Sequence, residues 1–152
     1  MPLKPLNRRI IGSIFATLLM LLVAIIPMQA QTTERPLSPA AAAELVRSEL
    51  LAAQMTQLAN PEQAEAILER VAQTWSETLV PSLGDADADA AATVDAALTA
   101  AQEALVSGNA PAFAAARATI WTALLKGSLA VVEQAIVEGD AALAQQWLPV
   151  RE

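Results

Sequence analysis

Apolar positions recur at helical spacing along most of the chain, and capping residues divide them into segments. Ser38-Pro39 and Asn60-Pro61 each place a capping side chain before a proline at the first helical position, where the missing N–H costs nothing. We predict a first helix from Ser38-Pro39 to about Ala59. The residues expected on its buried face are Leu45, Leu51, Met55 and Leu58.

The second predicted helix begins at Asn60-Pro61 and ends at Pro81, before a loop at residues 81–84. A third helix is predicted from about Ala90 to Val106, with Gly108 as its stop. The apolar stripe of the second helix comprises Ile67, Leu68, Val71, Trp75 and Leu79. That of the third comprises Val94, Leu98, Ala101 and Leu105.

The last third of the chain predicts a central helix of about 25 positions. Asn109 caps it, Pro111 lies in its first turn, and Gly139-Asp140 breaks it. A short helix follows at residues 141–148, and Pro149 closes that segment. The apolar residues of the central helix are Phe113, Ile120, Trp121, Leu124, Leu125, Val131, Val132 and Ile136.

These segments predict an all-α domain at residues 38–152, an antiparallel bundle of about four helices plus a short C-terminal helix. Alanine supplies 32 of the 122 positions from 31 to 152. Alanine is the best helix former, and its small side chain lets helices approach closely. Residues 31–37 form a polar linker before the bundle.

Residues 1–30 have the plan of a secretory signal. Lys4, Arg8 and Arg9 precede an uncharged apolar run at residues 10–26, which ends near the small residue Ala30. Seventeen uncharged residues also reach the lower length for a membrane span, so cleavage after Ala30 and retention as an anchor both stay open. Either alternative places the helical domain outside the cytoplasm, on the periplasmic side.

Composition excludes several classes of function. The chain has 16 acidic and 9 basic residues, and removing Lys4, Arg8 and Arg9 leaves 16 against 6, a net charge of −10 for residues 31–152. This charge repels nucleic acid and anionic lipid. Cys, His and Tyr are absent, which removes thiol nucleophiles and the commonest general base and metal ligands. We therefore expect neither an enzyme nor a cofactor, and we expect contact with a membrane only through the leader.

Asp85, Asp87 and Asp89 have the alternate spacing that opens an EF-hand calcium loop. The turn glycine of that loop would be Ala90 and its closing glutamate Ala96, so the pattern fails further on. The three aspartates are the candidate metal ligands, against the alternative of a solvated acidic helix start, which the sequence favours.

Two other groups of residues could form a functional site but also have a simpler structural interpretation. Glu65 and Glu69 lie one helical turn apart, as in di-iron bundles, but those proteins need histidine, so an exposed face shared with Arg70 is favoured. The three tryptophans could form a ligand cage, but each lies on an apolar stripe or at a helix end, which favours core packing. They are Trp75, Trp121 and Trp147.

An ordered set of residues in the last quarter of the chain resembles the extracytoplasmic region that precedes the membrane spans in bacterial high-affinity iron permeases. The matching residues are Ala116-Arg117, Ile120-Trp121, Leu124-Leu125, Gly127-Ser128, Ala135, Gly139-Asp140, Ala144, Trp147-Leu148 and Arg151-Glu152. The resemblance implies a role in iron uptake. It also implies that the permeation residues lie in Arg-Glu-x-x-Glu motifs on membrane helices.

Arg151-Glu152 does not fit such a motif, because Gln145, Gln146 and Pro149 precede it where apolar residues are needed. We expect no stretch in residues 31–152 long enough to span a membrane, and we transfer no iron ligand from the family. The resemblance then implies a leader and a helical domain separated from their permease. The alternative is a freestanding periplasmic interaction or structural module without a metal function.

We predict that export depends on residues 1–30 and that the mature N-terminus is Gln31, because the basic, apolar and small-residue segments come in the order of a cleavable signal. N-terminal sequencing of the protein from membrane and periplasmic fractions measures this. An intact Met1 in the membrane fraction would contradict cleavage and identify residues 10–26 as an anchor.

Overall fold

A computed structural model of the chain describes residues 36–151. One compact unit, Leu37–Glu152, holds every helix described below. The predicted leader at residues 1–30 and residues 31–35 of the predicted linker lie outside the described residues. Every regular element in the described part is a helix, which confirms the all-α prediction.

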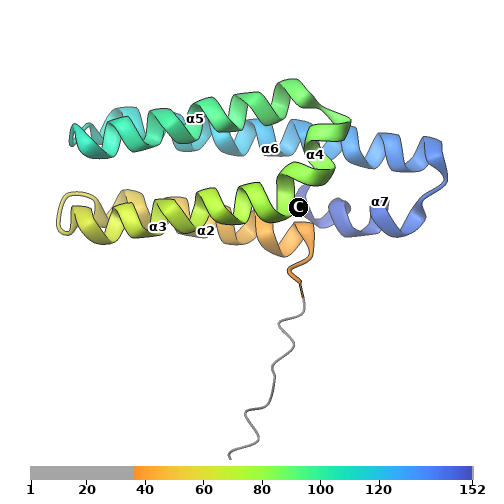
Figure 1. Cartoon of the computed structure of the whole chain (residues 1–152), viewed down its shortest axis with the longest axis horizontal. Coiled ribbons are helices and arrows are strands. Elements are labelled where there is room, and N and C mark those ends of the chain that lie inside the picture. Colours follow the sequence, from red (N-terminus) through yellow and green to blue (C-terminus); the bar gives the residue numbers. More distant parts are fainter. Residues whose placement is uncertain (1–35, 152) are drawn as a thin grey trace, which may run out of the picture. The chain divides into compact units, whose positions relative to one another are not determined.

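The first half of the domain is a pair of neighbouring helical stretches. α2 (Pro39–Thr56) turns back into α3 (Pro61–Thr74). α3 continues through the π-helical turn η1 (Trp75–Leu79) into α4 (Val80–Ala86). In Figure 1, α4 rises from the end of this pair toward the second half of the domain.

The second half is a long hairpin that covers the first. α5 (Ala88–Val106) packs mainly on α6 (Ala110–Glu138), and α7 (Ala141–Trp147) folds back against α6. The 3₁₀ turn η2 (Leu148–Arg151) follows and contacts α2 and α6. Figure 1 shows the α5–α6 layer above the α2–α3 layer, an arrangement that agrees with the predicted bundle.

Local capping chemistry places most of the helix boundaries. In four predicted caps, a side-chain oxygen accepts the N–H three residues further on at 2.9 to 3.3 Å. These caps are Ser38, Asn60, Asn109 and Asp140. Gly108 and Gly139 have φ values of 65° and 76°, the left-handed conformation that ends a helix and that glycine adopts without a Cβ clash. The predicted stops at both glycines are confirmed.

The prediction that Pro81 ends the second helix is wrong. The backbone N–H of Val80 bonds to the carbonyl of Trp75, five residues back, so the chain widens into a π turn immediately before the proline. Pro81 then lies in the first turn of α4, where its missing N–H is not needed. The predicted loop at residues 81–84 is therefore helical, and Asp87 alone separates α4 from α5.

The predicted buried face of α2 is also wrong. Leu51, Met55 and Leu58 are 46%, 77% and 76% exposed. The side chains that are buried instead are Ala42, Ala43, Val46, Leu50 and Ala53. The spacing of large apolar residues could not reveal this face, because alanine makes up much of the buried face of α2 and several larger apolar side chains are exposed to solvent. Ile136 of α6, another predicted core residue, is likewise 66% exposed.

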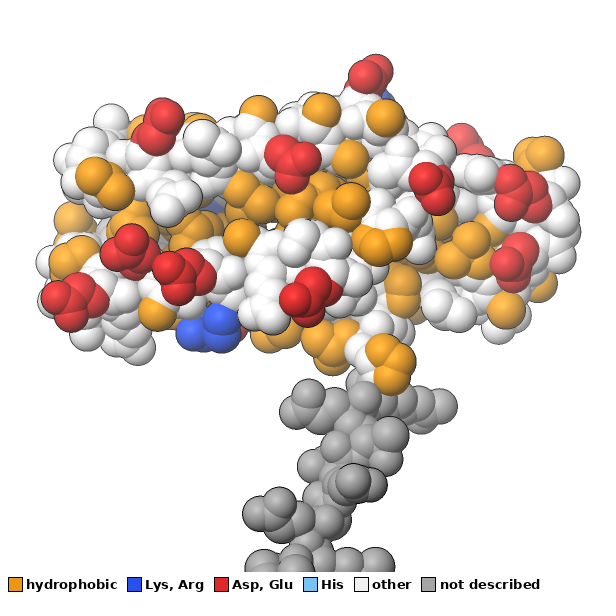
Figure 2. Space-filling view, viewed as in Figure 1, with side chains coloured by type: hydrophobic (Ala, Val, Ile, Leu, Met, Phe, Trp, Pro, Cys, Tyr) orange, Lys and Arg blue, Asp and Glu red, His pale blue; other side chains and the backbone are white. Residues whose placement is uncertain are grey.

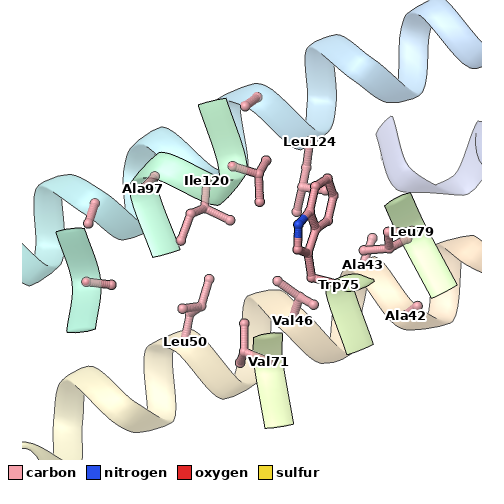
Figure 3. Packing of buried hydrophobic residues seen from close by; sticks show 14 of the residues in the cluster. Ala42, Ala43, Val46, Leu50, Val71, Trp75, Leu79, Ala97, Ile120 and Leu124 are labelled. Atoms are coloured by element: carbon pink, nitrogen blue, oxygen red, sulfur yellow. The ribbon is translucent and has the colours of Figure 1, made fainter. Parts of the chain in front are cut away.

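α6 is the central helix, as predicted. Its buried residues run from Phe113 to Ala135, and Figure 3 shows Ile120 and Leu124 pointing into the space between the two layers, with Leu124 beside the Trp75 ring. By length and composition alone α6 could also cross a membrane, which corrects our expectation that no such stretch exists in residues 31–152. In this structure it packs as the core helix of the bundle.

Gly127 is where α4 comes closest to α6. A Cβ atom built on Gly127 would lie 2.7 Å from Cγ of Leu83, far inside the distance of an ordinary contact. Leu83 is itself fully buried, so it has no open space into which it can turn. The packing of α4 on α6 therefore requires a residue without a side chain at position 127.

We predict that Gly127→Ala destabilises the domain by about 1–3 kcal/mol, because it overpacks a closed site. The matched control is Gly84→Ala, also within a helix, where the added Cβ would meet only Val80 Cγ1 at 3.9 Å. That variant should be neutral or slightly stabilising, since alanine is the better helix former. Urea unfolding followed by circular dichroism measures both. Equal unfolding midpoints for the two variants would contradict the close approach, whereas partial recovery of Gly127→Ala by Leu83→Ala would support it.

Candidate functional site

The three candidate aspartates fall on two helices and the residue between them. Asp85 belongs to α4, Asp87 is the N-cap of α5, and Asp89 lies in the first turn of α5. Asp87 Oδ1 accepts the N–H of Ala90 at 2.9 Å, and its Oδ2 lies 3.2 Å from Nζ of Lys126 on α6. Asp85 and Asp89 are exposed. Within residues 36–151 no three carboxylates form a group that could hold a metal ion.

Asp87 acts instead as a structural anion. The N–H of Ala90, and then Lys126, lower the pKa of the Asp87 carboxyl group below its ordinary value. A lowered pKa in the folded state means that the contribution of Asp87 to stability is present at neutral pH. It is lost as the pH falls through this lowered pKa, below about 3.9.

A third carboxylate, which the sequence pattern did not predict, lines the same cleft as Glu65 and Glu69. Both line a cleft of about 600 Å³ between α3 and α5, and Asp95 of α5 lines the same cleft. We call this the acidic cleft. We predicted that Arg70 would share this face, but it does not. It reaches α2 instead, where its Nε lies 2.9 Å from Oε1 of Glu49. Among the described residues, Glu65, Glu69 and Asp95 have no basic partner within ion-pair distance.

Trp75 holds Asp95 in place at the acidic cleft. The indole Nε1 donates to Asp95 Oδ1 at 2.7 Å, while the ring itself is only 2% exposed. Uncharged polar side chains complete the walls, and they are Gln73, Ser76, Thr99 and Gln102. A hard cation such as calcium needs six to eight converging oxygens, which three spread carboxylates do not provide. The acidic cleft can therefore attract cations through its charge without enclosing one.

The tryptophans do not form a cage. Trp75 and Trp147 are buried in the core on different elements, as predicted for core side chains. Trp121 is only partly buried, and the guanidinium carbon of Arg47 lies 5.7 Å from its ring centroid. The core prediction is thus confirmed only in part for Trp121, which packs against the core but lies at its edge, where Arg47 of α2 covers the ring.

Acidic side chains are distributed over both layers of the domain. Figure 2 shows them on the α5–α6 layer and on the α2–α3 layer, with few basic side chains on the same face. On the face drawn, acidic side chains are therefore spread over both layers, and the acidic cleft brings three of the described carboxylates together. Such a surface raises the local concentration of cations within about one Debye length.

Comparison with known proteins identifies one family. The family model described as the iron permease FTR1 N-terminal domain matches residues 35–152. The match covers every helix of the domain, and so extends the resemblance of residues 116–152 to the whole bundle. No curated protein and no solved structure matches the chain.

We predict that the chain binds ferric and calcium ions only weakly, with dissociation constants above about 0.1 mM, because no oxygen cage is assembled. Calorimetric titration at low and moderate salt should show binding that fades as salt rises, since exposed charges are screened beyond about 8 Å at physiological ionic strength. The triple variant Glu65→Gln, Glu69→Gln and Asp95→Asn should weaken it further.

The opposite result is equally specific. Submicromolar, stoichiometric and salt-insensitive binding that disappears in an Asp85→Ala, Asp87→Ala and Asp89→Ala variant would contradict this prediction. It would make the aspartate triad a true metal site.

Proposed function

This chain belongs to the iron permease FTR1 N-terminal domain family, and from that premise we propose that residues 38–152 form an extracytoplasmic domain that serves iron uptake across the membrane. The family match over residues 35–152 is the observation that carries the proposal. The leader-like order of Lys4, Arg8 and Arg9 before the apolar run at residues 10–26 supports export of the domain.

The domain contributes charge to uptake. Its unpaired carboxylates Glu65, Glu69 and Asp95 raise the cation concentration near the surface and release each ion readily, because they do not enclose it. Screening limits this effect to about 8 Å at physiological ionic strength, so the domain must lie beside the entrance of the permease to act. Permeation itself belongs to membrane helices of the permease.

The same proposal assigns no reaction to the domain. Without Cys, His or Tyr, the chain has no thiol or phenol nucleophile and no imidazole base. Most of its described carboxylates are exposed to solvent, unlike the buried carboxylates that are typical of catalytic sites. This chemistry supports a role in concentrating cations or in docking a partner protein.

One observation favours a second candidate, a freestanding interaction module. Leu51 and Met55 on α2 and Leu58 in the turn that follows it are exposed apolar side chains at three- and four-residue spacing. Exposed apolar side chains in a continuous patch are typical of protein contact surfaces. In this alternative the domain is exported and binds a protein partner without influencing iron.

The accumulation of radiolabelled ferric iron by cells in low-iron medium separates the two candidates. Deletion of the gene should lower the initial rate of accumulation, and the full chain should restore it. A chain lacking residues 1–30 should not restore it, because it would stay in the cytoplasm. An unchanged rate after deletion would contradict the role in iron uptake and favour the interaction module.

The location is measured separately. Protease added to spheroplasts should digest residues 38–152 if the domain is extracytoplasmic. Protection of the domain in intact spheroplasts, with digestion only after lysis, would contradict that location whatever the uptake result.

A further inference from the structure

A cleft between α2 and α6 has the opposite charge to most of the surface. Its volume is about 310 Å³, and each of the two helices contributes one arginine to it. The lining residues are Arg47, Leu50, Arg117, Ala118, Trp121 and Thr122. We call it the arginine cleft. Two guanidinium groups in one cleft repel each other, an arrangement that an anion between them would stabilise.

Arg117 has no counter-charge within the described part of the chain. Each of the other three basic side chains described there pairs with a carboxylate at 2.7 to 3.2 Å, whereas Arg117 makes no ion pair and no side-chain hydrogen bond. Its Nε is buried without a partner, and residues 113–121 hold no acidic side chain. A partly desolvated charge without a partner destabilises the folded state, so an anion bound in the cleft would stabilise Arg117.

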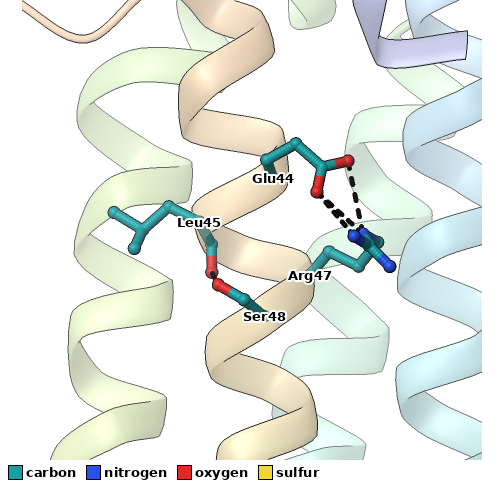
Figure 4. A network of polar contacts seen from close by, with 4 residues as sticks. All are labelled: Glu44, Leu45, Arg47 and Ser48. Carbon is teal, nitrogen blue, oxygen red and sulfur yellow. Dashed lines mark hydrogen bonds and ion pairs between the residues drawn. The ribbon is translucent and has the colours of Figure 1, made fainter. Parts of the chain in front are cut away.

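Arg47 is held in place and retains free donors. Its Nε and Nη2 donate to the Glu44 carboxylate, with the shortest distance 2.7 Å, and Figure 4 shows this clamp on one side of the guanidinium. Nη1 makes no hydrogen bond with the described residues. The group lies over the Trp121 ring, and Glu44 raises the pKa of Arg47. Glu44 offsets the charge of Arg47, so the cleft keeps a net positive charge from Arg117.

We propose that the arginine cleft binds a small organic anion that carries two or three carboxylate groups. Planar guanidinium donors match the oxygens of a carboxylate, so Arg117 can bind one carboxylate, and the free Nη1 of Arg47 can donate to a second. Leu50 and Trp121 form an apolar wall for the carbon skeleton. The volume lies at the lower end of ligand pockets, which suits a molecule of this size. The assignment does not depend on the role in iron uptake.

Calorimetric titration of the full chain with citrate tests the assignment. Citrate should bind stoichiometrically and at least about tenfold more tightly than inorganic phosphate, since phosphate offers the charge without a carbon skeleton for the apolar wall. Arg117→Gln should weaken citrate binding by about tenfold or more. The matched control is Arg70→Gln, which makes the same charge change between α2 and α3 and should alter the affinity less than about twofold.

Thermal denaturation provides a second measurement of citrate binding, which can be used even if a variant folds poorly. Citrate should raise the melting temperature of the wild type and of Arg70→Gln, but not that of Arg117→Gln. Without citrate, Arg117→Gln should be at least as stable as the wild type, because it removes a partly buried charge that has no partner. Absence of citrate binding by the wild type, equal losses in both variants, or phosphate binding as tight as citrate would overturn the proposal.

Discussion

Close approach of helices through small side chains is the constraint on which this fold depends. The chain has only three Trp and two Phe residues, and many of the contacts between its helices are made by alanine and by one glycine. Gly127 of α6 receives Leu83 of α4, and the adjacent Lys126 pairs with Asp87 at the start of α5. These neighbouring contacts fix both α4 and α5 on α6. They thereby set α5 beside α3, where the acidic cleft forms.

The sequence predicted local chemistry better than tertiary packing. The caps at Ser38, Asn60, Asn109 and Asp140 depend on contacts three residues apart, so the pattern was sufficient to find them. The buried face of α2 was missed, because alanine and leucine are both apolar and only the neighbouring helix decides between them. Pro81 predicts a helix end that the structure does not have, because a π turn that accommodates a proline leaves no signal in the apolar spacing.

Both clefts were beyond sequence reasoning for the same reason. The acidic cleft joins the predicted Glu65 and Glu69 to Asp95 of a different helix, and the arginine cleft joins Arg47 to Arg117 across the bundle. Spacing along one helix cannot show which side chains of another helix lie opposite. The structure thus separates two surfaces of opposite charge. One attracts cations loosely, and the other has the donors for an organic anion.

We propose that the domain serves iron uptake through its charge rather than by chelation. The most direct measurement is the initial rate of ferric iron uptake by cells that carry either the wild-type chain or the Glu65→Gln, Glu69→Gln and Asp95→Asn variant, at low and at moderate ionic strength. We expect slower uptake by the variant at low ionic strength and a smaller difference at moderate ionic strength, where screening shortens the range of the charges. Equal rates at both ionic strengths, with the variant folded and exported, would contradict it.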